Sequence, residues 1–273
     1  MIKASLFRGS MSDLNFFFNP TSVAVIGASD SVGSVGYETI KNMLDTFKGD
    51  VYAVNLKEKP IFGKTCYKSI LDIPNEVDMA IIAVPAPFVK DVLDECGRKK
   101  VKGVVIISGG FSEIGEKARE DELLDIAKKF GIRIIGPNCI GIYDNYSGVN
   151  TIFLSKEKIS YPPKGKISFL SQSGAFAGLI LDWTSKERIG MSKVVSYGNK
   201  IDVNEADLIN YLDEDENTKV ICLYIEGIRR GLKFMEAAKK VSKRTPILAL
   251  KSGTTKSGAK AASSHTGSLA GED

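Results

Sequence analysis

Short apolar runs alternate with amphipathic stretches along most of the chain, and this alternation restricts the fold more than any other feature. Apolar runs bounded by turn residues are typical of strands that are buried on both faces. The stretches between them place apolar side chains three and four residues apart, as on one face of a helix. The alternation predicts an α/β fold with parallel sheets covered by helices on both faces. The predicted strands are 23–26, 51–54, 79–84, 104–107, 132–135, 167–170, 193–196, 220–225 and 247–250.

Composition excludes several classes of protein. Of the 273 residues, 43% are hydrophobic and 26% charged, which is the balance of a soluble globular protein. The net charge of +4 is spread along the chain, and no apolar run approaches membrane-spanning length, so we expect neither nucleic acid nor membrane as a partner. The cysteines are too far apart for a metal or redox motif, which favours free buried thiols, no metal site and a cytoplasmic location. They are Cys66, Cys96, Cys139 and Cys222.

The chain is long enough for two domains. Residues 155–165 are polar and contain a Pro-Pro pair, which predicts a linker. The linker would separate a first domain at 16–154 from a second at 166–273, with an N-terminal extension at 1–15. The sequence stops eight residues after His265, before a further strand and helix, so we expect the second sheet to be incomplete at its C-terminal end.

A glycine-rich loop follows the first predicted strand. Gly27 ends the strand, and Gly33 and Gly36 come soon after it. Glycine at these points allows a tight turn and lets a phosphate approach backbone N–H groups at a helix start. The spacing is longer than the dinucleotide fingerprint G-x-G-x-x-G, so a turn that only joins strand to helix is the alternative.

The end of the second predicted strand favours a phosphorylated ribose. Asn55-Leu56-Lys57 stands where NAD-binding domains place an acid for the ribose diol. A lysine suits the phosphate of NADP or CoA, although a solvated surface charge is the alternative. Two further loops, Val84-Pro85-Ala86-Pro87 and Gly136-Pro137-Asn138-Cys139, also follow strand ends, where open parallel sheets bind ligands.

Two polar features of the second domain also follow strands. Ser171-Gln172-Ser173-Gly174 lies between a strand and a helix, where small hydroxyl residues either cap the helix or hold an anion. Glu226 ends the strand 220–225, where a carboxylate is either part of a site or simply solvated.

The helix after the Ser171–Gly174 loop is predicted from an apolar stripe. Phe176, Leu179, Ile180 and Trp183 have the spacing of one helix face. We therefore expect Trp183 to pack in the core.

The chain has one histidine, His265, which lies in a run of small residues at 262–268. Because that run is not an apolar face, a core histidine is a poor explanation, and a solvated loop histidine is the remaining alternative. Imidazole is a competent nucleophile near neutral pH, and small neighbours leave room for a phosphoryl group. His265 is therefore a candidate phosphoryl carrier.

In these motifs the chain resembles the nucleoside-diphosphate-forming acyl-CoA synthetases and, more distantly, the α subunit of succinyl-CoA synthetase. The most specific motif is Ser-His-Thr-Gly-Ser-Leu-Ala-Gly around His265. The resemblance implies a Rossmann-like CoA-binding domain followed by a flavodoxin-like domain of the succinyl-CoA synthetase type. It extends from about residue 16 to the end of the chain, through the motifs at 26–29, 33–36, 84–88, 108–113, 136–139 and 264–271.

The resemblance also implies roles for individual residues. Phosphate attacks an acyl thioester, His265 carries the phosphoryl group, and Glu226 orients the histidine by accepting its second ring N–H. CoA and acyl-CoA are substrates, and the nucleotide with Mg²⁺ belongs to an ATP-grasp β subunit or downstream domain in an oligomer. Phosphate would be bound by Ser171, Ser173, Gly174, Thr266 and Gly267, and CoA by Gly27, Ser29, Gly33, Ser34, Val35, Gly36, Lys57, Val84, Pro85, Ala86 and Asn138.

One position departs from the more distant relatives. Succinyl-CoA synthetases carry a tyrosine where Gly178 aligns, which favours a monocarboxylate such as acetate over succinate here. Two other functions are alternatives. A non-catalytic CoA-binding module would not need His265 and its loop, and an NADP-dependent oxidoreductase would leave the second domain unexplained.

Overall fold

A computed structural model of the protein describes residues 14–253. The first part contains the helices α1 (Asn15–Phe18), α2 (Val35–Thr46), α3 (Ala86–Arg98) and α4 (Lys117–Phe130), with short 3₁₀ turns at Ile70–Asp72 and Ser112–Ile114. Its strands are β1 (Ser22–Ile26), β2 (Asp50–Val54), β3 (Cys66–Tyr67), β4 (Met79–Ile82), β5 (Gly103–Ile106) and β6 (Arg133–Ile135).

The second part follows the same alternation of strand and helix. Its helices are α5 (Gly174–Lys186), α6 (Glu205–Glu214) and α7 (Gly231–Val241). Its strands are β7 (Gly141–Asp144), β8 (Lys164–Ser171), β9 (Met191–Ser196), β10 (Val220–Ile225) and β11 (Ile247–Lys251). The predicted strands all form, with boundaries that differ by a few residues.

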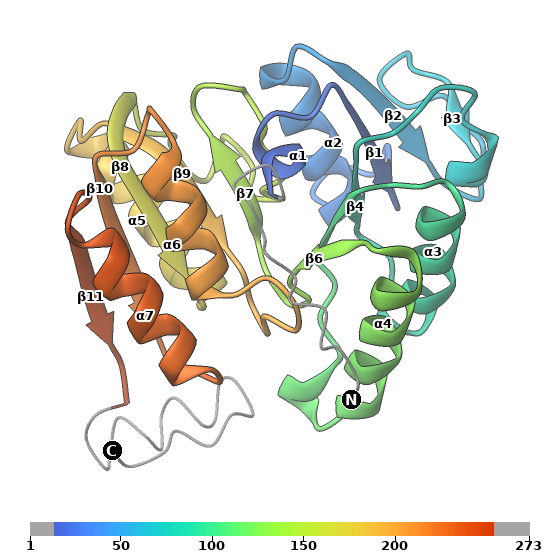
Figure 1. The fold of residues 1–273 in the computed structure, drawn as a ribbon. Helices are drawn as coiled ribbons and strands as arrows, with labels where there is room; N and C mark the ends of the chain where they lie inside the picture. Colours follow the sequence, from blue (N-terminus) through green and yellow to red (C-terminus); the bar gives the residue numbers. More distant parts are fainter. Residues whose placement is uncertain (1–13, 254–273) are drawn as a thin grey trace, which may run out of the picture.

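Two sheets lie side by side in Figure 1, and β7, the edge strand of the second sheet, is on the side that faces the first. The first has the strand order β3-β2-β1-β4-β5-β6, and its strands are all parallel. The order reverses direction between β1 and β4, which is the point where doubly wound sheets bind ligands at their carboxyl ends. This arrangement confirms the Rossmann-like first domain.

Alternate residues of β1 face two different layers. Val23 and Val25 belong to one hydrophobic cluster, whereas Ala24 and Ile26 belong to another. The first cluster includes residues of α1 and α2, and the second includes residues of α3 and α4. Because both faces are covered, every residue of β1 is buried, as the continuous apolar run predicts.

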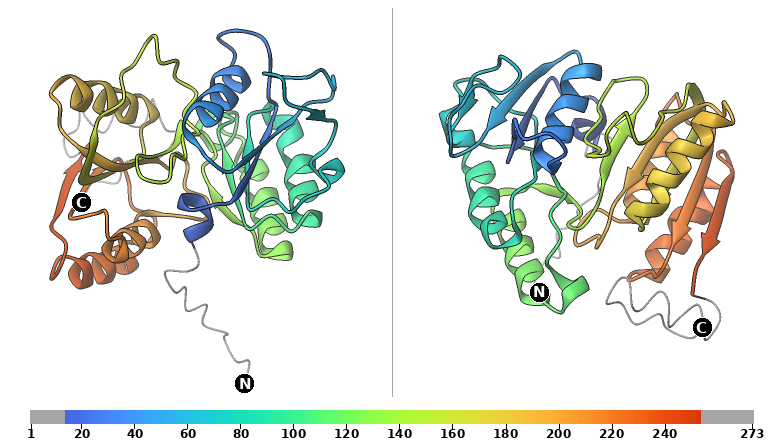
Figure 2. Two further views of the ribbon diagram at one scale, coloured as in Figure 1. Left: turned by 90° about the horizontal axis from the view of Figure 1, so that it is seen from above. Right: turned by 180° about the vertical axis from the view of Figure 1, so that it is seen from behind.

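The second sheet has the order β11-β10-β8-β9-β7. The helices α6 and α7 cover one face, and α5 covers the other (Figure 2). The strands β8 to β11 pair in parallel, but β7 pairs antiparallel with β9, so the sheet is mixed at this edge. The buried Lys193 of β9 contacts the carboxylate of Asp144 of β7 at 3.4 Å and that of Asp215 at 2.7 Å. The contact with Asp144 links β7 to β9 by an ion pair in addition to the backbone pairing.

This topology corrects two predicted boundaries. β7 lies within 16–154 but belongs to the second sheet, so the first sheet ends at β6. β8 begins at Lys164, so the last two residues of the predicted linker are part of a strand. Sequence analysis predicted no strand at Gly141–Asp144, because these four residues form too short an apolar run to be recognised.

The predicted stripe on α5 is only half confirmed, because Phe176 and Ile180 pack against the hydrophobic cluster but the other two residues do not. Trp183 is 49% exposed and Leu179 is 60% exposed, whereas the buried residues of the helix are Ala177, Gly178, Leu181 and Thr184. Small residues on the buried face let the helix approach the sheet closely. The face that packs is therefore shifted from the one with the largest side chains.

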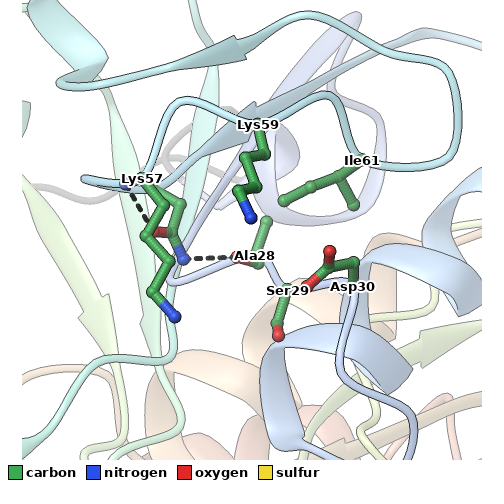
Figure 3. A pocket seen from close by; sticks show the side chains of 7 residues that line it. Ala28, Ser29, Asp30, Lys57, Lys59 and Ile61 are labelled. Atoms are coloured by element: carbon green, nitrogen blue, oxygen red, sulfur yellow. Dashed lines mark hydrogen bonds between the residues drawn. The ribbon is translucent and has the colours of Figure 1, made fainter.

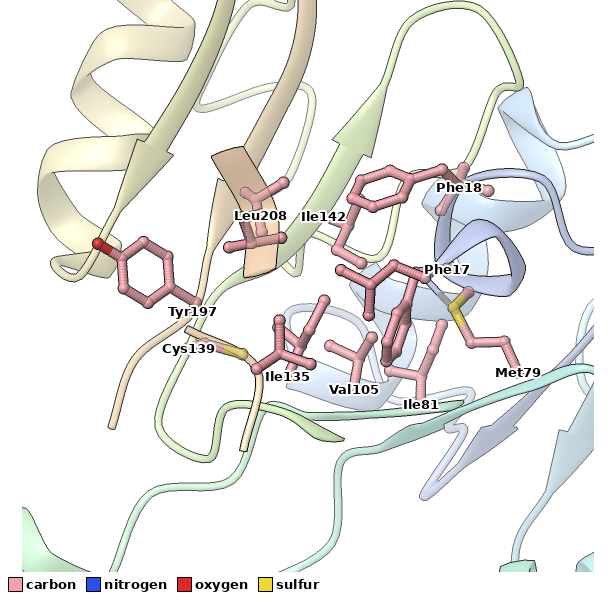
Figure 4. Packing of buried hydrophobic residues seen from close by; sticks show 14 of the residues in the cluster. Phe17, Phe18, Met79, Ile81, Val105, Ile135, Cys139, Ile142, Tyr197 and Leu208 are labelled. Atoms are coloured by element: carbon pink, nitrogen blue, oxygen red, sulfur yellow. The ribbon is translucent and has the colours of Figure 1, made fainter. Parts of the chain in front are cut away.

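The two domains share one hydrophobic cluster. Figure 4 shows Phe17 and Ile81 of the first domain packed near Ile142 and Leu208 of the second. The same interface carries an ion pair between Arg133 and Asp202, whose charged atoms are 2.9 Å apart. The shared core therefore packs the two domains against each other.

Three of the cysteines, Cys66, Cys96 and Cys139, are buried, Cys222 is partly buried, and all four are free thiols. Burial raises the pKa of the Cys139 thiol to about 12, so it is protonated at neutral pH. Between residues 14 and 253, no helix is both long and apolar enough to cross a membrane.

Candidate functional site

The glycine-rich loop joins β1 to α2 through a tightly packed turn. Gly27 has a φ of +92°, and a Cβ at this position would lie 2.7 Å from the carbonyl oxygen of Ala83. A Cβ at Gly36 would lie 1.9 Å from the carbonyl oxygen of Gly27. The loop then starts α2 at Ser34, whose hydroxyl accepts from the N–H of Tyr37 at 3.2 Å. Both glycines are therefore required for the strand to turn directly into the helix.

The other predicted loops of the first domain gather at the same edge of the sheet. Val84 and Pro85 follow β4, and Pro85 is the residue that precedes α3. The hydroxyl of Ser108, beyond β5, donates to the carbonyl of Val84, and the N–H of Asn138, beyond β6, donates to the carbonyl of Ser108 at 2.9 Å. The carboxyl ends of β4, β5 and β6 are thus linked in one row beside the Gly27–Gly36 loop.

A pocket beside this loop contains two lysines. Lys57 and Lys59 line it together with Ser29 and Asp30, and Figure 3 shows both side chains extended towards the loop. The amide of Asn55 positions the segment, because its nitrogen donates to the carbonyl of Ala28 at 2.7 Å and its oxygen accepts from the N–H of Lys57 at 2.9 Å. Sequence analysis identified Lys57 but missed Lys59, which lies two residues further along the same turn.

Asn199 joins the first domain to the second. Its amide oxygen accepts from the amide nitrogen of Asn138 at 3.2 Å, and its own nitrogen donates to the carboxylates of Glu113 at 2.6 Å and Glu120 at 2.7 Å. Burial alone would raise the pKa of Glu113, but hydrogen bonds from the backbone of Gly110 and from Asn199 stabilise the anion and lower it. Asn138, a predicted CoA residue, is therefore held from the other domain.

The Ser171–Gly174 loop joins β8 to α5. Ser173 is the N-cap of α5, with its hydroxyl accepting from the N–H of Phe176 at 3.3 Å. Ser171 is buried, and its hydroxyl donates to the carbonyl of Ser173 at 2.8 Å. The loop therefore provides the N-cap of α5, as one of the two alternatives predicted. The first N–H groups of α5 lie at the same helix end, where the helix dipole favours an anion.

Glu226 lies beside that loop. It follows β10, which pairs with β8 so that Tyr224 is opposite Ser171. The side-chain oxygen of Gln172 accepts from the N–H groups of both Glu226 and Gly227. The structure therefore brings together two of the predicted features of the second domain, and sequence analysis missed Gln172, which connects them. His265, Thr266 and Gly267 lie outside the described residues.

A buried polar cluster, unpredicted from the sequence, surrounds the Glu226 turn. Tyr197 is fully buried, and within 14–253 its hydroxyl has no hydrogen-bond partner. Burial and the nearby carboxylates of Glu205 and Glu226 raise its pKa well above the ordinary value, so the hydroxyl keeps its proton. In Figure 4 that hydroxyl points away from the shared hydrophobic cluster. Lys200 is also buried and donates to Glu205 and to the carbonyl of Gly227.

Metal binding was not predicted for this chain. Across the described part of the chain, no group of three or more His, Cys, Asp or Glu side chains is arranged to hold a metal ion.

The fold and these loops define a two-domain protein that combines a CoA-binding domain with a domain of the succinyl-CoA ligase type. Residues 21–145 match the family described as CoA binding domain, and residues 164–273 match the family described as succinyl-CoA ligase like flavodoxin domain. In both domains the chain is similar to nucleoside-diphosphate-forming acyl-CoA synthetases.

Relatives with this architecture are similar over nearly the whole chain. The acetate–CoA ligase (ADP-forming) of Methanocaldococcus jannaschii is 51% identical over 96% of this chain and 36% of that protein. The acetate–CoA ligase (ADP-forming) II subunit alpha of Pyrococcus furiosus is 52% identical over 94% of this chain and 56% of that protein. The chain therefore spans about one third to just over half of the length of these two relatives.

A solved structure shows the same fold. The dinucleotide forming acetyl-coenzyme A synthetase 1 of Ca. Korarchaeum cryptofilum, in complex with phosphate and ADP, superimposes with a TM-score of 0.89 at 42% identity. The match covers 95% of this chain and 56% of that one. This likeness confirms the predicted fold class for both domains.

Proposed function

We propose that this chain is the CoA-binding and phosphoryl-carrying component of an ADP-forming acyl-CoA synthetase, an acid–thiol ligase. The reaction converts acyl-CoA, phosphate and a nucleoside diphosphate into carboxylate, CoA and a nucleoside triphosphate. The observation that carries the proposal is the junction of Glu226 with the Ser171–Gly174 loop at the carboxyl ends of β10 and β8. A carboxylate beside a helix N-terminus suits a histidine that exchanges a phosphoryl group.

In the first domain, CoA binds along the row of strand ends. The Gly27–Gly36 loop offers backbone N–H groups at the start of α2 to the phosphates. Lys57 and Lys59 are placed to attract the 3′-phosphate in their pocket. The thiol end then lies towards Asn138, which Asn199 fixes from the second domain.

In the second domain, phosphate binds at the N-terminus of α5. Ser171, Ser173 and Gly174 contribute to its binding, together with Thr266 and Gly267 of the His265 motif. Phosphate oxygen attacks the acyl carbonyl, CoA leaves as the thiolate, and the acyl phosphate passes its phosphoryl group to a ring nitrogen of His265, releasing the carboxylate. Glu226 accepts the other ring N–H and stabilises the positive charge that develops on the imidazole.

The nucleotide binds on an ATP-grasp unit supplied by a β subunit or a downstream domain, within an oligomer. Mg²⁺ bound there with the nucleotide would neutralise the phosphate charge during transfer. This division of labour agrees with the relatives' names, one of which is a subunit alpha.

The acyl group is a small monocarboxylate such as acetate. Gly178 is buried in α5, and a Cβ there would lie 2.9 Å from the Cδ1 atom of Leu154. A tyrosine at this position would displace Leu154, because Leu154 already occupies the space that a tyrosine side chain would need. Both relatives described above are named acetate–CoA ligases.

The direct test is a reconstitution assay. The complete complex should form ATP from acetyl-CoA, phosphate and ADP, and residues 1–273 by themselves should form none because the proposed nucleotide site lies on the ATP-grasp unit. ATP formation by the pure chain would contradict the requirement for a partner. A complete complex that forms no ATP with any acyl-CoA of a panel would contradict the proposed activity.

A further inference from the structure

The turn at Glu226-Gly227 is held from two sides by side chains of neighbouring loops. Gln172, between β8 and α5, accepts from the N–H groups of both residues, with a distance of 2.9 Å to the nitrogen of Gly227. Lys200, between β9 and α6, donates to the carbonyl of Gly227. The ends of three strands, β8, β9 and β10, therefore meet at this one turn.

Lys200 is not an ordinary surface lysine. Its side chain is only 5% exposed, and its amine also contacts the carboxylate of Glu205, which is 3% exposed. Burial lowers the pKa of the Lys200 amine by disfavouring its charged form, and Glu205 opposes that shift. A buried ion pair is costly to desolvate and adds little stability compared with packed apolar residues. The cost of burying the Lys200–Glu205 pair is explained if the Lys200 amine is needed to hold the Glu226-Gly227 turn.

We propose that Lys200 is a positioning residue that fixes the Glu226 carboxylate by holding the carbonyl of Gly227, while Gln172 holds the N–H groups of the turn. The inference rests on the proposed function, in which Glu226 accepts a ring N–H of His265. A hydrogen bond to a reacting imidazole depends on placement to within a fraction of an ångström, and a misplacement of about 1 Å costs about 10²-fold in rate. Fixing both edges of the turn restricts such movement.

The test compares two variants in the complete enzyme complex. Lys200→Met removes the contact with Gly227 but also leaves Glu205 as an unpaired buried charge, so it should lower the melting temperature. Lys200→Met combined with Glu205→Gln removes that charge, so the melting temperature should recover. The rate of phosphoryl transfer from labelled ATP to this chain should stay about 10²-fold lower in the double variant. The KM for CoA should not change, because the first domain is untouched.

A matched control comes from the other buried lysine of the same sheet. Lys193 lies in the middle of β9, three residues before its carboxyl end, and contacts Asp144 and Asp215 rather than the Glu226 turn. Lys193→Met should lower the melting temperature while the folded enzyme keeps the parent rate of labelling.

Three outcomes separate the ideas. A double variant that is labelled as fast as the parent overturns the role of Lys200 and leaves the proposed function standing. The same loss of rate in Lys193→Met also overturns that role, because general loosening of the domain would then explain the effect. A parent complex that takes up no label overturns the proposed function, and the role of Lys200 falls with it.

Discussion

Gly36 lies directly against the carbonyl oxygen of Gly27: a Cβ built at Gly36 would be 1.9 Å from that oxygen. The contact joins the end of β1 to the first turn of α2. Gly33, in the same loop, has a φ of +79° but no atom within 4 Å of a built Cβ. Two glycines of one loop are therefore required for different reasons, one for space and the other for backbone conformation.

Gly36→Ala should destabilise the first domain far more than Gly33→Ala. Alanine at Gly36 forces α2 away from the strand, which we expect to cost about 3 kcal/mol or more and to abolish CoA binding. Alanine at Gly33 meets only the left-handed backbone penalty of about 1–2 kcal/mol. Urea unfolding of the two variants measures the difference. Equal losses of stability would contradict the packing role of Gly36.

Lys57→Ala should weaken the binding of CoA but not that of dephospho-CoA. Lys57 is exposed beside the pocket that Ser29 and Asp30 line, so its amine can reach a phosphate without desolvation. We expect a loss of about tenfold, or about 1.4 kcal/mol. Calorimetry with both ligands tests this, with Lys128→Ala as the control because that side chain is 73% exposed on α4. Equal affinities of the parent for the two ligands would exclude Lys57 as the partner of the 3′-phosphate.

Asp78→Asn should reduce stability at neutral pH and have no effect in strong acid. Burial would raise the pKa of Asp78, but hydrogen bonds from Thr21 and Lys102 outweigh it and lower the pKa to about 2, from 3.8. Because the folded-state pKa is depressed, the stabilisation is fully present above about pH 4 and is lost as the pH falls towards 2. At pH 7 it should be about 1–2 kcal/mol.

Urea unfolding at a series of pH values checks this dependence. The gap between the parent and Asp78→Asn should close between about pH 4 and pH 2. Asp125, whose side chain is 80% exposed, provides the control through Asp125→Asn. A gap that is constant across this range would show that Asp78 acts by shape rather than by charge.

The sheets could be predicted from the sequence because buried parallel strands leave a strong signal. Every residue of β1 and of β5 is buried, so both appear as continuous apolar runs bounded by turns. β7 was not predicted as a strand, and its four residues do not encode which sheet edge they pair with. That choice depends on tertiary contacts such as the one between Asp144 and Lys193.

Helix faces were harder to predict than helices. The side chains of Leu179 and Trp183 formed the more hydrophobic stripe of α5, yet Ala177 and Leu181 face the sheet. Hydrophobic periodicity weights large side chains, whereas close packing of a helix on a sheet favours small ones. Here the spacing identified the helix but not its buried face.

The positions of the candidate site residues at strand ends could be predicted, but the contacts that support those residues could not. Gly27, Asn138 and Glu226 follow strands, and their position at strand ends marked them. Gln172 and Lys200 act through side-chain contacts with the Glu226 turn that no local spacing encodes. Such contacts join loops from different strands, so they emerge only when the strand order is known.

The central claim is that His265 carries the phosphoryl group. The most direct measurement incubates the complete complex with labelled ATP and Mg²⁺ and maps the label by mass spectrometry under alkaline conditions. The label should be on His265, stable to base and labile to acid as a phosphoramidate is, and absent from the His265→Ala variant, which should still bind CoA. Label that remains on this chain in the His265→Ala variant would contradict the account.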